Sequence, residues 1–241
     1  MVQVCLNGER DATDGARIPL TPDALATAAA EAVAAGATDL HVHPKTPCGR
    51  DSLSPGVVTP VLEAIRARVT VPVGITTGAW TEQDPSARVA RVHSWTTLPD
   101  HASVNWHEPG AEEVAAALLE RGVAVEAGIW SGTDALRRFA RSPLAAQVLR
   151  ILAEVTDPNP DTAEETARTL LSELDATGID RPVLLHGAEG GTWPVLRLAR
   201  RLGLATRTGL EDTLYLPNGE RAESNAELVT EALRTETAGR P

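Results

Sequence analysis

The segment TPDALATAAAEAVAAGATDLHVHP (residues 21–44) joins an alanine-rich helical stretch to a short, mostly apolar run. Thr21-Pro22-Asp23 has the composition of a helix start, with proline at an early position where its missing backbone N–H is tolerated. The run Asp39–Pro44 is short and mostly apolar, as a strand covered by helices on its outer face should be. The segment therefore predicts one helix–strand unit of a parallel sheet.

This unit recurs along the whole chain. The strand candidates are Val2–Asn7, Asp39–Pro44, Val71–Thr76, His101–Trp106, Val123–Ile129, Leu149–Val155, Pro182–His186 and Ala205–Leu210. The clearest helical stretches are Ala111–Arg121, Asp134–Arg141, Thr162–Thr177 and Glu220–Arg234. We expect the last residues, Thr235–Pro241, to be frayed. Eight repeats predict a closed (β/α)8 TIM barrel, a single domain over residues 1–241, and the alternative is an open doubly wound sheet.

Length, charge and cysteine content restrict the class of protein. The chain has 241 residues and a formal net charge of −11, so a broad basic surface for nucleic acid is not expected. No apolar stretch approaches the roughly 18 residues of a membrane span, and the start shows no signal peptide. Cys5 and Cys48 give neither a disulfide framework nor a metal-binding CxxC pair. We therefore expect a cytoplasmic protein with no nucleic-acid or membrane partner.

The sequence HVHP ends the second predicted strand. His41 and His43 lie two residues apart, so their side chains project to the same side of that strand. Active sites of such barrels gather at the C-terminal ends of the strands. Two neutral imidazoles at this spacing suit a cation such as Zn²⁺, and the alternative is a pair of hydrogen-bonded core histidines.

The sequence RTGLED ends the eighth predicted strand. Glu211 could supply a third, carboxylate ligand, which leaves the open position that a catalytic metal needs. Asp212 would then be a general base or an outer carboxylate, and Arg207 could keep it ionised or clamp a substrate carboxylate. The alternative is an ordinary helix N-terminus, where acidic residues are favoured.

Polar residues follow two further strands. Thr76, Thr77 and Gly78 could bind a carboxylate through hydroxyl and backbone N–H groups, although a plain polar turn explains them equally well. Ser103 and Asn105 lie two residues apart within the fourth strand, so both side chains point to one face, and they are candidates for substrate binding.

Two other features indicate a site. Glu126 lies within an apolar strand, where a lone acid is costly to bury unless it is paired. The turn HGAEGGTWP (residues 186–194) follows the seventh strand, and its glycines Gly187, Gly190 and Gly191 would let a ligand approach the backbone. A helix N-terminus after such a turn favours phosphate, but a bare glycine-rich turn has little specificity.

These motifs together resemble the β-keto acid cleavage enzymes. The similarity runs along nearly the whole chain and includes LNGER, GATDLHVHP, VPVGITTG, VEAGIW, VLLHG, GLATRTGLEDTLYLPNG and SNAELV. HVHP and RTGLED carry most of the specificity. The resemblance implies a homo-oligomeric barrel, a dimer or tetramer, that binds Zn²⁺ or another divalent transition metal. It implies the condensation of a β-keto acid with acetyl-CoA, which gives acetoacetate and a new acyl-CoA.

The resemblance also assigns residues to roles. It implies His41, His43 and Glu211 as metal ligands; Arg207 and Asp212 as the catalytic pair; Glu126 as a site glutamate; and Thr76 or Thr77 as the hydroxyl that binds the substrate carboxylate. The turn with Gly187, Gly190 and Gly191 is expected to bind the CoA end of acetyl-CoA. Glu9 is a further candidate for substrate binding, but many members carry the acid one position beyond it, where this chain has Arg10, and the chain is shorter than typical members.

Three other functions stay open from the residues alone. A zinc hydrolase also uses an HxH pair, but on the first strand and with further histidines on strands five and six, which this chain lacks. A metal-dependent aldolase or lyase would need no CoA. A non-catalytic binding barrel would have no need of the Arg207–Asp212 pair.

Overall fold

The computed structural model describes residues 1–14 and 18–234, so the prediction for Thr235–Pro241 lies outside the described residues. The strands of the sheet are β1 (Val2–Cys5), β2 (Asp39–Val42), β3 (Val73–Thr76), β4 (His101–Asn105), β5 (Ala124–Trp130), β6 (Arg150–Val155), β7 (Val183–Gly187) and β8 (Thr206–Thr208). They form one parallel eight-stranded sheet in the order β7-β6-β5-β4-β3-β2-β1-β8.

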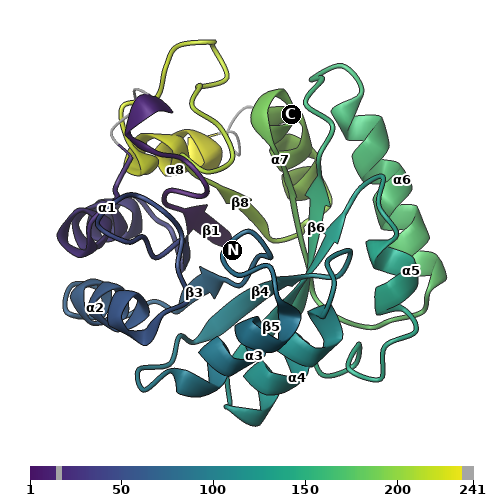
Figure 1. Cartoon of the computed structure of the whole chain (residues 1–241). Helices are drawn as coiled ribbons and strands as arrows, with labels where there is room; N and C mark the ends of the chain where they lie inside the picture. The colour runs from purple at the N-terminus through teal and green to yellow at the C-terminus, as the bar shows by residue number, and fades with distance from the viewer. Residues whose placement is uncertain (15–17, 235–241) are drawn as a thin grey trace.

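The two ends of this order, β7 and β8, meet and close the sheet. The backbone N–H of Leu185 donates to the carbonyl of Ala205 at 2.9 Å, and the hydroxyl of Thr206 donates to the carbonyl of Leu185 at 2.8 Å. The first and last strands, β1 and β8, are neighbours near the centre of Figure 1. The predicted (β/α)8 barrel is therefore confirmed, and the open doubly wound sheet is wrong.

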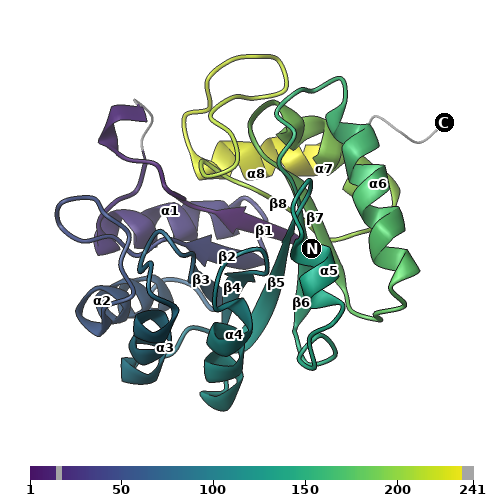
Figure 2. The same cartoon turned by 45° about the vertical axis from the view of Figure 1, so that its right-hand side comes forward.

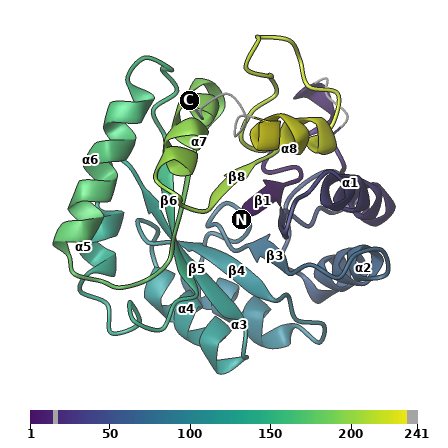
Figure 3. The ribbon, with the colours of Figure 1, turned by 180° about the vertical axis from the view of Figure 1, so that it is seen from behind.

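Helices surround the strands in all three views of the ribbon (Figures 1–3). They are α1 (Pro22–Ala34), α2 (Pro55–Arg66), α3 (Pro85–Ser94), α4 (Ala111–Glu120), α5 (Ala135–Phe139), α6 (Ala163–Ala176), α7 (Thr192–Arg201) and α8 (Asn225–Arg234), with short 3-10 turns η1 (Ala12–Asp14) and η2 (Glu189–Gly191). α1 begins as predicted, because the Thr21 hydroxyl accepts a hydrogen bond from the N–H of Ala24 at 3.3 Å. None of the helices described is long and apolar enough to cross a membrane.

The predicted helix Glu220–Arg234 is wrong at its start, since α8 begins only at Asn225. The preceding residues form a loop that pairs with itself: Leu216 N–H donates to the carbonyl of Glu220 at 2.8 Å, and Ala222 N–H donates to that of Leu214 at 2.9 Å. These backbone bonds replace those that a helix over the same residues would make.

The lower end of the barrel, where the strands begin, holds a buried ion network in place of apolar side chains. Arg150 donates to Glu126 at 2.6 Å and to Asp39 at 3.0 Å. His101 lies 3.0 Å from Asp39 and 3.1 Å from Glu126, and Gln3 donates to both acids. We call Gln3, Asp39, His101, Glu126 and Arg150 the lower network. It fills the barrel interior beneath the site, so the opposite end is the open one.

Candidate metal centre and active-site cavity

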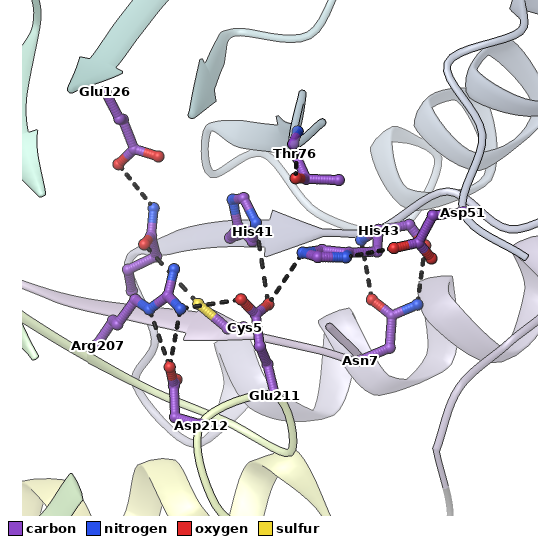
Figure 4. Close-up of polar contacts among 12 residues, drawn as sticks. Cys5, Asn7, His41, His43, Asp51, Thr76, Glu126, Arg207, Glu211 and Asp212 are labelled. Atoms are coloured by element: carbon purple, nitrogen blue, oxygen red, sulfur yellow. Dashed lines mark hydrogen bonds and ion pairs between the residues drawn. The ribbon is translucent and has the colours of Figure 1, made fainter. Parts of the chain in front are cut away.

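His41, His43 and Glu211 come together at the upper end of the barrel, where the strands end (Figure 4). Each offers one ligand atom, and these atoms all lie within 4.8 Å of one another. Nε2 of His41 lies 3.9 Å, and Nε2 of His43 3.5 Å, from Oε2 of Glu211. The backbone at Gly8 has a φ of +55°, and a Cβ there would lie 2.4 Å from Cγ of Glu211. Gly8 of LNGER therefore leaves the room that Glu211 occupies.

The donor atoms of this cluster fit a divalent transition metal. Oε2 of Glu211 is buried and accepts no hydrogen bond within the described residues. Burial lowers the pKa of His41 to about 4, so its imidazole is neutral, as a ligand must be. Burial also lowers the pKa of His43, but Glu211 and Asp51 raise it to about 9, so a proton competes with a metal for that imidazole. Two histidines and one carboxylate form the ligand set of many catalytic zinc sites.

Asp51 orients the second histidine, and sequence reasoning missed it. Its Oδ2 accepts hydrogen bonds from Nδ1 of His43 and from Nε1 of Trp80, both at 2.9 Å, and its Oδ1 pairs with Lys45 at 2.5 Å. Because Nδ1 of His43 contacts Asp51, Nε2 is the nitrogen that faces Glu211 and that a metal or a proton can occupy, as in many carboxylate–histidine–metal arrangements. Trp80 also stacks on His43, with ring centroids 5.9 Å apart. Asp51 lies in a loop where no spacing marks it.

Arg207 links the metal cluster to Asp212. Its Nε and one terminal nitrogen donate to Oδ1 of Asp212 at 3.0 and 2.9 Å, and the same terminal nitrogen donates to Glu211 at 2.9 Å. Oδ2 of Asp212 is buried without a hydrogen-bond partner among the described residues. Glu211 and Asp212 lie in a turn after β8, and both carboxylates accept from the same terminal nitrogen of Arg207 (Figure 4).

A cavity of about 360 Å³ opens over this cluster. The predicted site residues that line it are Glu9, His41, His43, Thr76, Ser103, Asn105, Arg207 and Glu211. Its wall also contains Arg10, Asp14, Trp80, Trp130, Leu152, Glu154 and Glu189. Asp212, only 2% exposed, lies behind this wall.

Besides Asp212 and the three glycines of the turn after β7, three other predicted residues, Thr77, Gly78 and Glu126, lie outside the cavity wall. Thr77 donates through its hydroxyl to the carbonyl of Ser103 at 2.7 Å, and the N–H of Gly78 donates to the hydroxyl of Thr76 at 3.1 Å. These bonds shape the turn that presents Thr76. Glu126 belongs to the lower network and is apart from the two imidazoles in Figure 4. Burial raises its pKa, but His101 and Arg150 hold it well below the usual range.

The glycine-rich turn after β7 also lies beside the cavity. A Cβ at Gly190 would lie 2.2 Å from the carbonyl oxygen of Pro158, and one at Gly191 would lie 2.5 Å from that of Asp157. These glycines therefore allow the turn to pack against the loop after β6, which explains them without a ligand. Gly190 lines a second cavity of about 370 Å³, which shares Glu189 with the first.

The fold and this cavity define the class of protein: a (β/α)8 barrel with a candidate two-histidine, one-carboxylate metal centre at the C-terminal ends of its strands. The family profile for beta-keto acid cleavage enzymes matches residues 1–241. The chain therefore belongs to the β-keto acid cleavage enzyme family, and the predicted resemblance is confirmed.

Solved structures support the fold. The apo structure of ObcA is similar with a TM-score of 0.70 and 16% identity, over 93% of this chain and 62% of that chain. A ternary complex of ObcA with a C4-CoA adduct and oxalate gives a TM-score of 0.71 and 16% identity, over 93% and 64%. This chain thus spans less than two thirds of ObcA. An N-acetylmannosamine-6-phosphate 2-epimerase from Clostridium perfringens gives a TM-score of 0.56 and 14% identity, over 88% and 87%. No curated protein matches the sequence.

Proposed function

We propose that this protein is a metal-dependent acyltransferase that condenses a β-keto acid with acetyl-CoA and releases acetoacetate and a new acyl-CoA. One observation supports the proposal most strongly. In this member of the family, the cluster of His41, His43 and Glu211 faces the same cavity as Arg207, and Asp212 lies behind Arg207. The ObcA complex with a C4-CoA adduct supports the use of CoA.

His41, His43 and Glu211 would hold Zn²⁺ or another divalent transition metal. When bound, such an ion acts as a Lewis acid that stabilises negative charge developing on the substrate oxygens. Thr76, which lines the cavity, would bind the substrate carboxylate through its hydroxyl.

Other wall residues would orient the rest of the keto acid. Ser103 and Asn105 line the same cavity and offer a hydroxyl and an amide. Glu9 stands at its rim, and burial raises its pKa. We assign Thr77 and Gly78 to supporting the turn of Thr76, since neither lines the cavity.

Asp212 would take the proton from C2 of the keto acid, with Arg207 holding its carboxylate in place through two hydrogen bonds. The unpartnered Oδ2 of Asp212 is free to accept that proton. The resulting carbanion attacks the thioester carbon of acetyl-CoA and expels the CoA thiolate. The thiolate then attacks the distal acyl carbon, the original carbon–carbon bond breaks, and acetoacetate leaves. Glu126, beneath the cluster, would act only by keeping the lower network in place.

The turn with Gly187, Gly190 and Gly191 is proposed to receive the CoA end of the co-substrate. The second cavity beside it supports this placement, because it adjoins the first one at Glu189. We further propose that the protein is a homo-oligomer, a dimer or tetramer. We also propose that it is cytoplasmic, a setting in which free thiols such as those of the two described cysteines are expected. Light scattering of the purified protein measures the oligomer size.

A screen of 3-oxo acids with and without acetyl-CoA, read by acetoacetate release, tests the function. Acetoacetate that forms only when both substrates are present supports the acyl transfer. Cleavage at the same rate without acetyl-CoA would instead identify a lyase or hydrolase.

A further inference from the structure

His186 on β7 is a buried imidazole with no role in the steps above. It is 0% exposed, and neither ring nitrogen has a hydrogen-bond partner among the described residues. Two carboxylates flank it: Oε2 of Glu154 lies 3.7 Å from Nε2, and Oδ1 of Asp212 lies 3.5 Å from Nδ1. Buried polar atoms without partners are costly, and catalytic hydrogen bonds are often long before the substrate binds. The arrangement therefore points to a group that works with a ligand.

Glu154 connects this imidazole to the cavity. It lies opposite His186 in the register of β6 and β7, and it lines the cavity. Nδ1 of His186 faces Asp212, which Arg207 holds in place through hydrogen bonds, and Nε2 faces Glu154, so the imidazole lies between the two carboxylates. Burial raises the pKa of Glu154, which favours its protonated form.

We propose that Glu154 is the catalytic acid that protonates C2 of acetoacetate as it is released, and that His186 is its positioning residue. The inference rests on the proposed function, whose second half has no other assigned proton donor. In that step the CoA sulfur forms a bond to the distal acyl carbon, and the bond from that carbon to C2 breaks. The electron pair stays on C2, which takes the proton from the Glu154 carboxyl and leaves a carboxylate.

The proton balance closes over one turnover. The first half removes one proton from C2 and the second half returns one, so no external acid is consumed. Asp212 gives up to solvent the proton that it took from C2, and Glu154 regains one from solvent in the open cavity, so both groups return to their starting states.

Glu154→Gln and His186→Gln test this assignment, because the two halves of the reaction can be measured separately. Exchange of the C2 hydrogens in deuterated water, without acetyl-CoA and corrected for spontaneous exchange, reports the first half. Acetoacetate release reports the whole reaction. We expect Glu154→Gln to retain exchange and to lose release by about 10²–10⁴-fold, the usual contribution of a positioned acid. His186→Gln should show the same split with a smaller loss.

The surface pair His93 and Glu120 supplies matched controls. Its atoms lie 4.0 Å apart with side chains 46% and 71% exposed, so His93→Gln and Glu120→Gln should change neither rate. Equal losses of exchange and release in Glu154→Gln would indicate a structural role and overturn the proposal. Unchanged release would overturn it as well.

NMR of the imidazole nitrogens separates this inference from the reaction itself. Glu154→Gln should shift the ring nitrogens of His186 and leave those of His93 unchanged. If the His186 signals do not respond, the link between the two residues is wrong, whatever the activity. If they respond but the wild-type protein makes no acetoacetate, the proposed reaction is wrong, and the acid role falls with it.

Discussion

Replacing Arg150 with Met should destabilise the barrel strongly, because it removes the main cation of the lower network. The side chain of Arg150 is 8% exposed, and its partners Asp39 and Glu126 are 6% and 0% exposed. Two carboxylates would be left with His101 as their remaining ion partner. Removing one partner of a buried ion pair costs about 3–5 kcal/mol, and we expect a loss in this range in the free energy of unfolding.

Urea unfolding of matched variants measures this loss. Arg137 pairs with Asp134 at 3.2 Å, but its side chain is 66% exposed, so Arg137→Met should cost less than about 1 kcal/mol. The double variant Arg150→Met/Glu126→Gln should lose less than the sum of its two single variants, because they share one interaction. Equal losses in Arg150→Met and Arg137→Met, or fully additive losses in the double variant, would refute the structural role of the network.

Three further outcomes are expected. Asp212→Asn should slow exchange of the C2 hydrogens by about 10²–10⁴-fold and keep its metal. Glu211→Gln should lose the metal. If Asp212→Asn exchanges these hydrogens at the wild-type rate, Asp212 is not the base. Replacing Gly190 with Val should raise the apparent KM for acetyl-CoA more than that for the keto acid, and circular dichroism must show a retained fold, since a Cβ there meets Pro158. Burial lowers the pKa of His101, but Glu126 and Asp39 raise it to about 10. The protonated imidazole therefore stabilises the folded protein. This contribution to the free energy of unfolding is fully present below the unfolded pKa of about 6.5 and is lost as pH rises through 10. Urea unfolding at pH 7 and pH 10 should therefore show a larger cost of His101→Gln at pH 7, and an equal cost at both would contradict this.

The barrel could be predicted because its signal is repeated and local. Each strand is a short apolar run, and eight of them alternate with helical stretches. The C-terminal ends of the strands are harder to predict. The sequence predicts that the first two strands extend to Asn7 and Pro44, whereas β1 ends at Cys5 and β2 at Val42. Ladder pairing stops there, and no residue type marks that point.

The site could be predicted where the alternation of side chains along a strand alone decides which face each one points to. His41 and His43 share parity, and the structure brings them together. Parity does not give the height along the barrel axis, so Glu126 was expected at the site but lies in the lower network. Asp51 and His186 depend on contacts between distant segments, which a single sequence does not reveal.

Metal content and acetoacetate formation, measured together on the wild-type protein and on His41→Ala and His43→Ala, test the central claim most directly. We predict close to one divalent metal ion per wild-type chain, as a site with three protein ligands requires. Acetoacetate should form only with both a 3-oxo acid and acetyl-CoA, and both histidine variants should lose metal and activity together while circular dichroism shows a retained barrel. Unchanged metal content in both variants, or acetoacetate formation that does not need acetyl-CoA, would contradict the account.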